Sequence, residues 1–412
     1  MTKTHKLVPD RQRDRHLQWA CELTGLPTGA GREHRVVKWV RDWVSRRPSI
    51  RMKRDRFGNL LLSMPGRSRG RGRPLIFTAH LDHPAFVVRR IVDDKTVHLE
   101  FRGGVHESYF DNGRIVIHAG DGTQRRARIV SHEKGKVFRE AMAVVAGPGR
   151  RRVDGIEVSD LATWDLKPSR VTARGMMHSP ACDDLAGAAA ALSALDVLSK
   201  KRGWDGDVRV LLTRAEEVGF VGAIQACQSG IIPKNAQLIA LETSRTFSDS
   251  PIGNGPIVRV GDRISVFHHG LTFLACQVAE KLVSDSDGRF TWQRKLMPGG
   301  ACEATAFQAF GYEATSMCLA LGNYHNQGKI DDLQAGTLKG RPRIAQEFVS
   351  VEDYHGLVLL LVASGWGLTG RNPRGKGKVM PTSDGAAQIR DRMHNLISER
   401  GFVLEEPEAK IT

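Results

Sequence analysis

The sequence repeats one arrangement several times: a short run of apolar and β-branched residues that ends beside a carboxylate or an imidazole. The clearest case is Val208–Thr213, which is followed by Glu216 and Glu217. Runs of this kind favour strands that are buried on both faces, as in the parallel sheets of α/β proteins. Ligands and catalytic groups gather at the carboxyl ends of such strands. The repeat therefore predicts an α/β architecture with a polar site along one edge of its sheet.

Two adjacent acids after a strand are costly to hold together unless a cation or a shared proton offsets their repulsion. Taken alone, Glu216 and Glu217 are explained more simply as a solvated acidic loop. However, two further apolar runs end in the same way, one at His80 and one at Glu242. A solvated loop does not predict that repetition, whereas side chains that converge on one site do.

Alternation along the strand that ends at His80 places Asp82 on the same face and His83 on the opposite face. A single histidine at a strand end is by default a structural residue with satisfied hydrogen bonds. A ligating histidine commonly donates its second N–H to a carboxylate, and Asp82 can fill this role directly or through neighbouring backbone.

Asp183 and Asp184 precede an Ala/Leu-rich helical segment, Leu185–Leu198. Carboxylates are favoured at the positive end of a helix, so capping alone is a complete explanation of both. Farther along, the apolar run Ser316–Leu321 leads to His325. Both Asp183 and His325 thus stand where the repeated pattern would bring them to the same edge of the sheet.

Together these positions supply five nitrogen and oxygen ligands: His80, Asp183, Glu217, Glu242 and His325. A set without thiolates suits zinc, with cobalt or manganese as alternatives. Five ligands exceed the three that one catalytic zinc takes, but they suffice for two ions if a carboxylate bridges them. We expect Asp183 to be that bridge. Glu216, which is not a ligand, is placed to accept and deliver the proton of a metal-activated water in amide or peptide hydrolysis.

Between Pro84 and Met177 the pattern changes to short alternating strands separated by Gly and Asp turns. This pattern of short strands and turns is typical of a small β-barrel or sandwich. We therefore interpret residues 84–177 as an inserted β domain, 1–83 and 178–369 as two parts of a catalytic domain, and 370–412 as a basic linker and a C-terminal helix. Three histidines of the insertion are expected at its surface: His106, His118 and His132.

The positive charge of the chain is unevenly distributed. The formal net charge is +16, and residues 1–75 alone hold 19 Lys or Arg against 6 Asp or Glu. Such a region either contacts polyanions or is a basic surface unconnected with any partner. The Arg/Gly run at 66–74 is expected to be an exposed loop and is a weak candidate for RNA contact, because no aromatic stacking partners accompany it.

The six cysteines are scattered without a Cys-x-x-Cys pair. This pattern argues against a thiolate zinc site or a disulfide framework and fits a reducing compartment. The first residues carry positive charge but no apolar core of a signal peptide, and the longest apolar run, Leu357–Ala363, is too short to span a bilayer. We expect a soluble, cytoplasmic protein.

In order and spacing, the motifs around these residues resemble those of the dinuclear-metal aminopeptidases called glutamyl or tetrahedral aminopeptidases. The resemblance covers about residues 10–365 and rests on five segments: Ala79–Asp82, Cys182–Gly187, Glu216–Gly219, Gly253–Pro256 and Asn323–His325. It implies a mixed-sheet α/β/α zinc-peptidase-like catalytic domain with an inserted small β-barrel, two divalent metal ions, a peptide substrate with a free N-terminus, and a homo-oligomer that assembles through the insertion. It also implies the same five ligands, with Asp183 as bridge, Glu216 as base and Asp82 as the acid that supports His80.

The chain departs from the pattern of that family at three places. Glu242 stands where the family usually has Asp, Leu185 stands where it more often has Arg, and neither the basic loop nor the segment beyond Gly370 has a counterpart. A deacylase or carboxypeptidase on the same dinuclear scaffold fits the same ligands, because a ligand set does not specify the substrate. A nucleic-acid-binding protein with a decayed site would show binding that falls steeply with salt. It is disfavoured because every expected ligand position still holds a competent side chain.

Overall fold

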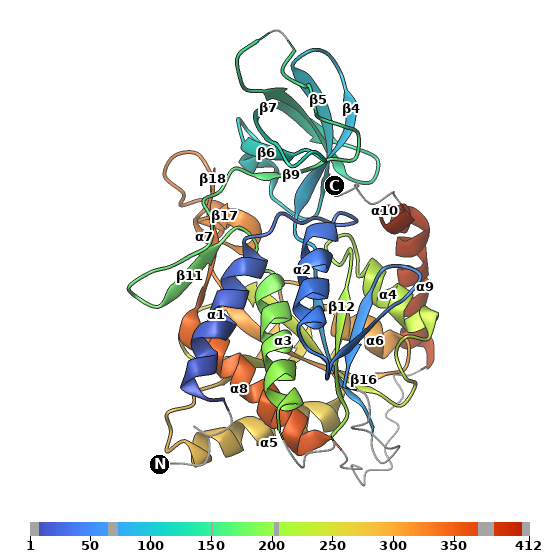
Figure 1. Ribbon diagram of the computed structural model, residues 1–412, viewed down its shortest axis with the longest axis vertical. Coiled ribbons are helices and arrows are strands. Elements are labelled where there is room, and N and C mark those ends of the chain that lie inside the picture. The colour runs from blue at the N-terminus through green and yellow to red at the C-terminus, as the bar shows by residue number, and fades with distance from the viewer. Residues whose placement is uncertain (1–7, 65–72, 150, 202–205, 370–382, 406–412) are drawn as a thin grey trace.

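The computed structural model describes residues 8–64, 73–149, 151–201, 206–369 and 383–405 (Figure 1). Most of the expected Arg/Gly loop lies outside them, and so do residues 370–382 of the segment expected to form a basic linker and a C-terminal helix. The larger part of the molecule is built on a mixed sheet with the strand order β1-β2-β12-β3-β13-β16-β14-β15. Its strands are β1 (Arg51–Arg54), β2 (Leu60–Ser63), β3 (Leu75–His80), β12 (Val208–Thr213), β13 (Gln237–Arg245), β14 (Ile257–Asp262), β15 (Gln293–Met297) and β16 (Glu313–Leu321). Strands β12, β3, β13 and β16 run parallel to one another at its centre.

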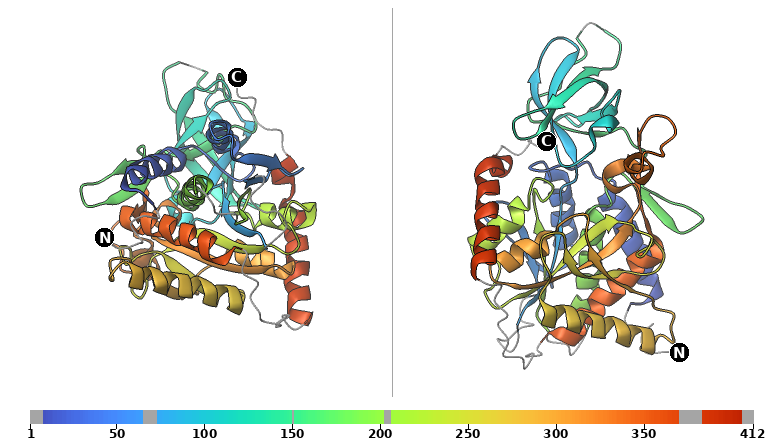
Figure 2. Two further views of the ribbon diagram at one scale, coloured as in Figure 1. Left: turned by 60° about the horizontal axis from the view of Figure 1, so that its bottom comes forward. Right: turned by 180° about the vertical axis from the view of Figure 1, so that it is seen from behind.

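Helices cover both faces of this sheet, which gives a three-layer α/β/α arrangement (Figures 1 and 2). One face packs against α1 (Asp10–Thr24), α2 (His34–Ser45), α3 (Leu185–Ser199), α5 (His269–Asp285) and α8 (Val351–Leu368). The other packs against α4 (Val221–Ser229) and α6 (Glu303–Ala309), and α9 (Ser383–Arg400) lies on these two helices. The predicted α/β class with a mixed sheet is confirmed.

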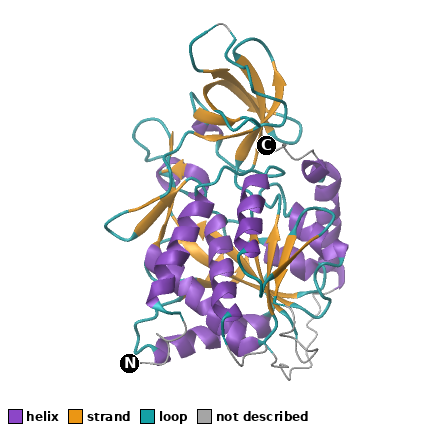
Figure 3. Ribbon diagram, in the orientation of Figure 1, coloured by secondary structure: helices purple, strands orange, loops and turns teal. Residues whose placement is uncertain are grey.

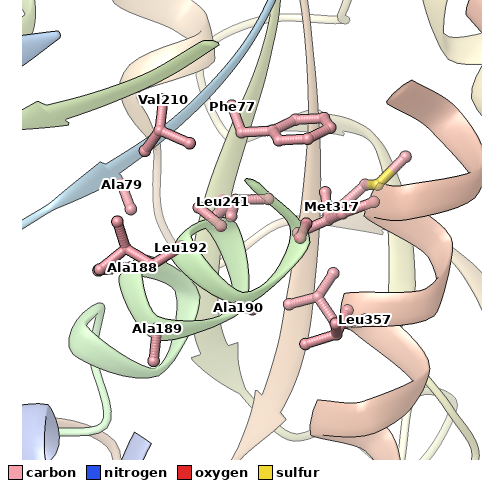
Figure 4. Close-up of a cluster of buried hydrophobic side chains, with 14 of the residues drawn as sticks. Phe77, Ala79, Ala188, Ala189, Ala190, Leu192, Val210, Leu241, Met317 and Leu357 are labelled. Carbon is pink, nitrogen blue, oxygen red and sulfur yellow. The ribbon is translucent and has the colours of Figure 1, made fainter. Parts of the chain in front are cut away.

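Alternation along the central strands supplies apolar side chains to both faces at once. Phe77, Leu241 and Met317 lie in the cluster with α3 and α8 (Figure 4). Ile76 and Ala240, each one residue before Phe77 and Leu241 on the same strands, lie in the cluster with α4 and α6. Each fully buried side chain of the size of Ile76 or Phe77 contributes about 1.5–3 kcal/mol relative to an exposed one. The continuous apolar runs of the sequence are therefore explained, because strands covered on both faces need apolar residues at every position.

A closed β-barrel is inserted between β3 and α3 and projects from the α/β part (Figure 1). In the order β4-β5-β8-β7-β6-β9, its strands are β4 (Ala85–Ile91), β5 (Thr96–Arg102), β8 (Arg139–Val145), β7 (Gln124–Lys134), β6 (Arg114–His118) and β9 (Leu161–Trp164). Aromatic rings fill the barrel, and those of Phe86 and Trp164 meet edge-on with centroids 4.8 Å apart. The predicted small β-barrel is confirmed.

The domain limits stay predictions. Strands β10 (Arg170–Val171) and β11 (Met176–Ser179) fall within the expected insertion, yet they belong to a separate small sheet with β19 (Glu347–Ser350). Figure 3 shows the helices, strands and loops of the described chain by colour. Its remaining short elements are η2 (Glu107–Tyr109), η3 (Tyr324–Asn326), β17 (Gln327–Gly328), α7 (Ile330–Gln334), β18 (Arg343–Ile344) and α10 (Phe402–Glu405). In the described part of the chain, no helix combines the length and the apolar character that crossing a bilayer requires.

The expectation that His118 lies at the surface is wrong. Its exposed fraction is 8%, and its Nε2 lies 2.9 Å from Thr163 Oγ1 on the neighbouring β9. The Arg35 guanidinium on α2 donates to the His118 carbonyl, so this end of the barrel is covered by the α/β part. Burial, helped by the charge of Arg35, lowers the pKa of His118 to about 4.

Candidate metal centre

Five side chains from distant parts of the sequence lie together at the carboxyl edge of the central sheet. Their side chains are at most 9% exposed. They come from the end of β3, the residue pair before α3, the loop after β12, the strand β13 and the turn after β16: His80, Asp183, Glu217, Glu242 and His325. These are the same five residues that the sequence indicates as ligands.

Asp183 lies between two groups of possible ligands. One group is His80, Asp183 and Glu242, the other is Asp183, Glu217 and His325, and within each group the ligand atoms lie within 4.8 Å of one another. Asp183 Oδ1 is 3.4 Å from His80 Nε2, whereas its Oδ2 is 3.5 Å from His325 Nε2. One oxygen of a single carboxylate thus faces each group, which is the arrangement that a bridge between two ions requires.

Hydrogen bonds orient both imidazoles so that Nε2 faces the carboxylates. His80 Nδ1 donates to the Asp82 carbonyl at 3.1 Å, and His325 Nδ1 donates to the Gly104 carbonyl at 2.6 Å. A carbonyl can only accept, so Nδ1 carries the proton and the lone pair of each neutral ring lies on Nε2. A lone pair that faces carboxylate oxygens is repulsive unless a cation or a proton lies between them. The donor set therefore fits divalent cations of the zinc, cobalt or manganese kind.

The cluster concentrates negative charge in a buried place. Burial, together with the charge of Asp183, raises the pKa of Glu242 to about 8. Burial and the neighbouring carboxylates of Glu242 and Glu217 raise the pKa of Glu216 well above its usual value. Burial alone would lower the pKa of His80, but the surrounding carboxylates raise it well above its usual value. Such mutual perturbation is typical of functional sites and of cation sites in particular.

Asp82 holds the loop that carries the two glutamates. Its carboxylate accepts the backbone N–H of Glu216 at 2.9 Å and that of Glu217 at 3.1 Å. The same carboxylate lies 3.6 Å from His80 Nδ1. Glu216 Oε2 is 3.9 Å from His80 Nε2, and Glu216 forms a third group with His80 and Glu217. Glu216 thus lies beside the two groups that share Asp183 without belonging to either.

Glu347, on β19, is part of the site although no sequence motif marks it. Its Oε2 accepts the backbone N–H groups of Cys182 and Asp183 at 2.7 and 3.0 Å, and its Oε1 accepts that of His325 at 2.8 Å. One buried carboxylate therefore fixes Asp183 and His325 relative to each other. The only signal in the sequence is an acid inside a short apolar strand, and the contact itself depends on the pairing of β19 with β11.

The capping explanation of the aspartate pair is wrong for Asp184. This residue immediately precedes α3, but its side chain makes no capping hydrogen bond. The peptide bond between Asp183 and Asp184 is cis. Asp183 instead accepts a hydrogen bond from Thr243 Oγ1 at 3.1 Å, on β13. Asp183 thus belongs to the site and lies inside both groups.

A cavity of about 330 Å³ opens beside the cluster. It is lined by Arg245 and Arg259, and His106, expected at the surface of the insertion, lies at its wall. Arg259 is 2% exposed, its Nη1 donates to Ser244 Oγ at 3.2 Å, and its Nη1 lies 3.9 Å from Glu242 Oε2. Among the described residues its buried Nε has no hydrogen-bond partner. The cavity thus offers a guanidinium next to the carboxylate cluster.

The central sheet is mixed, and at its carboxyl edge one aspartate is shared by two sets of imidazole and carboxylate groups. This combination is typical of dinuclear metal-dependent hydrolases. Residues 58–335 match the family model described as M42 glutamyl aminopeptidase. The chain therefore belongs to the M42 glutamyl aminopeptidase family, and it is a metal-dependent aminopeptidase.

Solved structures share the fold. Aminopeptidase APDkam598 from the archaeon Desulfurococcus kamchatkensis is 24% identical, with a TM-score of 0.70 over 87% of this chain and 96% of its own. The TET1 peptidase of Pyrococcus horikoshii is 19% identical, with a TM-score of 0.67 over 86% and 100%. A TET aminopeptidase from a marine sediment archaeon of the Thaumarchaeota is 16% identical, with a TM-score of 0.70 over 91% and 99%.

Proposed function

We propose that this aminopeptidase holds two divalent ions, zinc by preference, through His80, Asp183, Glu217, Glu242 and His325, with Asp183 between them. The proposal rests on one observation: two groups of possible ligands share Asp183. Within each group, the ligand atoms lie within 4.8 Å of one another. Glu347 supports the proposal, because its carboxylate accepts hydrogen bonds from the backbone N–H groups of Asp183 and His325 and so fixes both residues. Such outer partners keep ligating side chains in place.

Divalent ions held by these five residues would supply Lewis-acid activation of the scissile carbonyl and of an attacking water. Glu216 accepts the proton of that water and delivers it to the departing amino group. Asp82 fixes the position of this base, because its carboxylate binds the backbone N–H of Glu216. The Asp82 carbonyl keeps Nδ1 of His80 protonated, so that Nε2 stays available as a ligand atom.

We further propose that the cavity of about 330 Å³ takes the side chain of the N-terminal residue and prefers an acidic one. Arg245 and Arg259 both line it, and the buried Nε of each has no partner among the described residues. A carboxylate would satisfy these donors in a charge-assisted geometry. The description of the family as glutamyl aminopeptidases agrees with this preference.

A panel of substrates tests the proposed function. With zinc, cobalt or manganese added, Glu-p-nitroanilide should be hydrolysed with a kcat/KM about 10–100-fold above that of Gln-p-nitroanilide, the span expected for hydrogen bonds to a charged group. Equal rates for the two would contradict the acidic preference. Cleavage of N-acyl amino acids without turnover of any aminoacyl substrate would instead identify a deacylase, and release of C-terminal residues a carboxypeptidase.

We also propose that the chain forms a homo-oligomer through the barrel. Large apolar side chains on the barrel are exposed to solvent. Among them are Val92, Val130 and Val158, with exposed fractions of 41%, 58% and 56%. The TET1 peptidase of Pyrococcus horikoshii, which shares the fold, can assemble into a tetrahedron or a large octahedral shell. Native mass spectrometry should therefore give a multiple of the 45.5 kDa chain mass, and a monomer at all concentrations would refute the proposal.

A further inference from the structure

The C-terminal segment, formed by α9 and α10, lies against the loop 215–221 that carries the two glutamates after β12. Arg400 Nη1 donates to the Val218 carbonyl at 2.7 Å. Val403 is fully buried in an apolar cluster with residues of this loop. Asp82 holds the same loop from the side of the metal centre. The loop is therefore held between the sheet edge and the C-terminal segment.

Two glycines let the C-terminal segment approach this closely. A Cβ on Gly31, whose φ is +78°, would lie 2.1 Å from the Val403 carbonyl oxygen. A Cβ on Gly219, whose φ is +112°, would lie 3.2 Å from both terminal methyl groups of Leu396. The left-handed backbone and the lack of a side chain are both needed at these positions. Both close contacts of the C-terminal segment thus depend on a glycine in the chain against which it packs.

A second cavity, of about 560 Å³, lies between this segment and the metal centre. Its walls include Glu216, Glu217 and His325 on one side and Met393, Leu396 and Arg400 on the other. The first cavity, of about 330 Å³, shares the same three residues of the centre. A peptide that crosses the centre therefore has one part in each cavity. The smaller cavity suits a single N-terminal residue, and the larger one suits the part of the peptide that leaves.

Two arginines, Arg263 and Arg400, line this second cavity. Arg263, just after β14, is exposed and forms no ion pair with a carboxylate of the described residues. Arg400 Nε is buried and has no hydrogen-bond partner in the same part of the chain. Phe220, Ile264 and Leu396 line the cavity next to them with apolar surface. Guanidinium groups suit the planar carboxylate, so the cavity fits an apolar residue that ends in a free carboxylate.

We propose that the C-terminal segment forms the subsite for the leaving part of the substrate, and that Arg263 and Arg400 bind its C-terminal carboxylate there. This assignment rests on the proposed function. Only a short peptide can place its terminal carboxylate so near the scissile bond.

The test compares the dipeptide Glu-Leu with its C-terminal amide, which lacks the carboxylate. For the wild-type protein loaded with zinc, kcat/KM for the free acid should exceed that for the amide by about tenfold or more, mainly through KM. In Arg263→Gln and in Arg400→Gln this ratio should fall to within about threefold of one. Arg400→Gln also loses the donor to the Val218 carbonyl, but a slower rate on both substrates cancels in the ratio.

Arg90→Gln is the matched control, because Arg90 is an exposed arginine on the barrel strand β4. It should keep the wild-type ratio of acid to amide. A wild-type ratio near one, or a ratio that survives in both Arg263→Gln and Arg400→Gln, overturns the subsite while the aminopeptidase function stands. Absence of any turnover, including that of Glu-p-nitroanilide, overturns the proposed function and the subsite with it.

Discussion

Replacement of Glu216 by Gln should lower kcat by about 10³–10⁴-fold while the protein keeps its metal, since general acid–base catalysis contributes up to about 10⁴. The amide has the shape of the carboxylate but cannot accept a proton from water. Glu216 lies outside both groups of ligand atoms that share Asp183, so we expect the protein to keep both ions when the charge of Glu216 is removed. The measurement pairs kcat on Glu-p-nitroanilide with metal content by plasma mass spectrometry.

Glu133→Gln is the control for this experiment, because Glu133 is an exposed glutamate on the barrel strand β7. This variant should match the wild type in both kcat and metal content. Loss of metal from Glu216→Gln would mean that the proposed roles of Glu216 and Glu217 are exchanged. Retention of wild-type kcat would remove Glu216 from the chemistry altogether.

Replacement of Asp183 by Asn should abolish activity and take the metal content below one ion per chain. The two oxygens of Asp183 face different imidazoles at 3.4 and 3.5 Å, so a single substitution affects both proposed ion positions. An amide has no charge and offers one oxygen as ligand atom.

Glu242→Gln is the informative comparison, because Glu242 belongs to only one of the two groups that contain Asp183. We expect Glu242→Gln to retain about one ion per chain, whereas Asp183→Asn retains less than one. Circular dichroism verifies that both variants are folded. If Asp183→Asn kept one fully occupied ion and Glu242→Gln lost both, Asp183 would not be the bridge.

The strand ends of this site are predictable because they follow a local rule. The run Val208–Thr213 is apolar throughout, and it is β12 with the same limits. Parallel strands in one sheet bring their carboxyl ends to one edge, so residues after such runs must meet there. His80 and Glu242 followed from that rule without any coordinates. The strand that holds Glu242 nevertheless extends farther than its apolar run, to Arg245.

Other features of the site depend on contacts between elements that no local pattern links. Glu347 reaches the centre only because β19 pairs with β11. Arg259 becomes a wall of the first cavity because β14 lies beside β16 in the sheet. The contact of the C-terminal helix α9 with the loop after β12 joins residues far apart in the chain, so the sequence predicts the helix but not its position.

The departures from the family pattern have different consequences in the structure. Leu185 is fully buried in the main apolar core, so the position suits an apolar side chain. Glu242 reaches to 3.5 Å from His80 Nε2, which keeps it among the candidate ligands although the family usually has Asp there. Contact of the basic N-terminal region with polyanions stays a prediction, and residues 66–72 of its Arg/Gly loop are not described.

Two cations held by distant acids and imidazoles at one sheet edge are the basis of the proposed function. Metal analysis of the purified wild-type protein is the decisive measurement. After equilibration with zinc and removal of the excess, we expect two ions per chain, with activity that is lost on chelation and restored when two ions per chain are added back. Full aminopeptidase activity in protein that holds less than one ion per chain would rule out a dinuclear site.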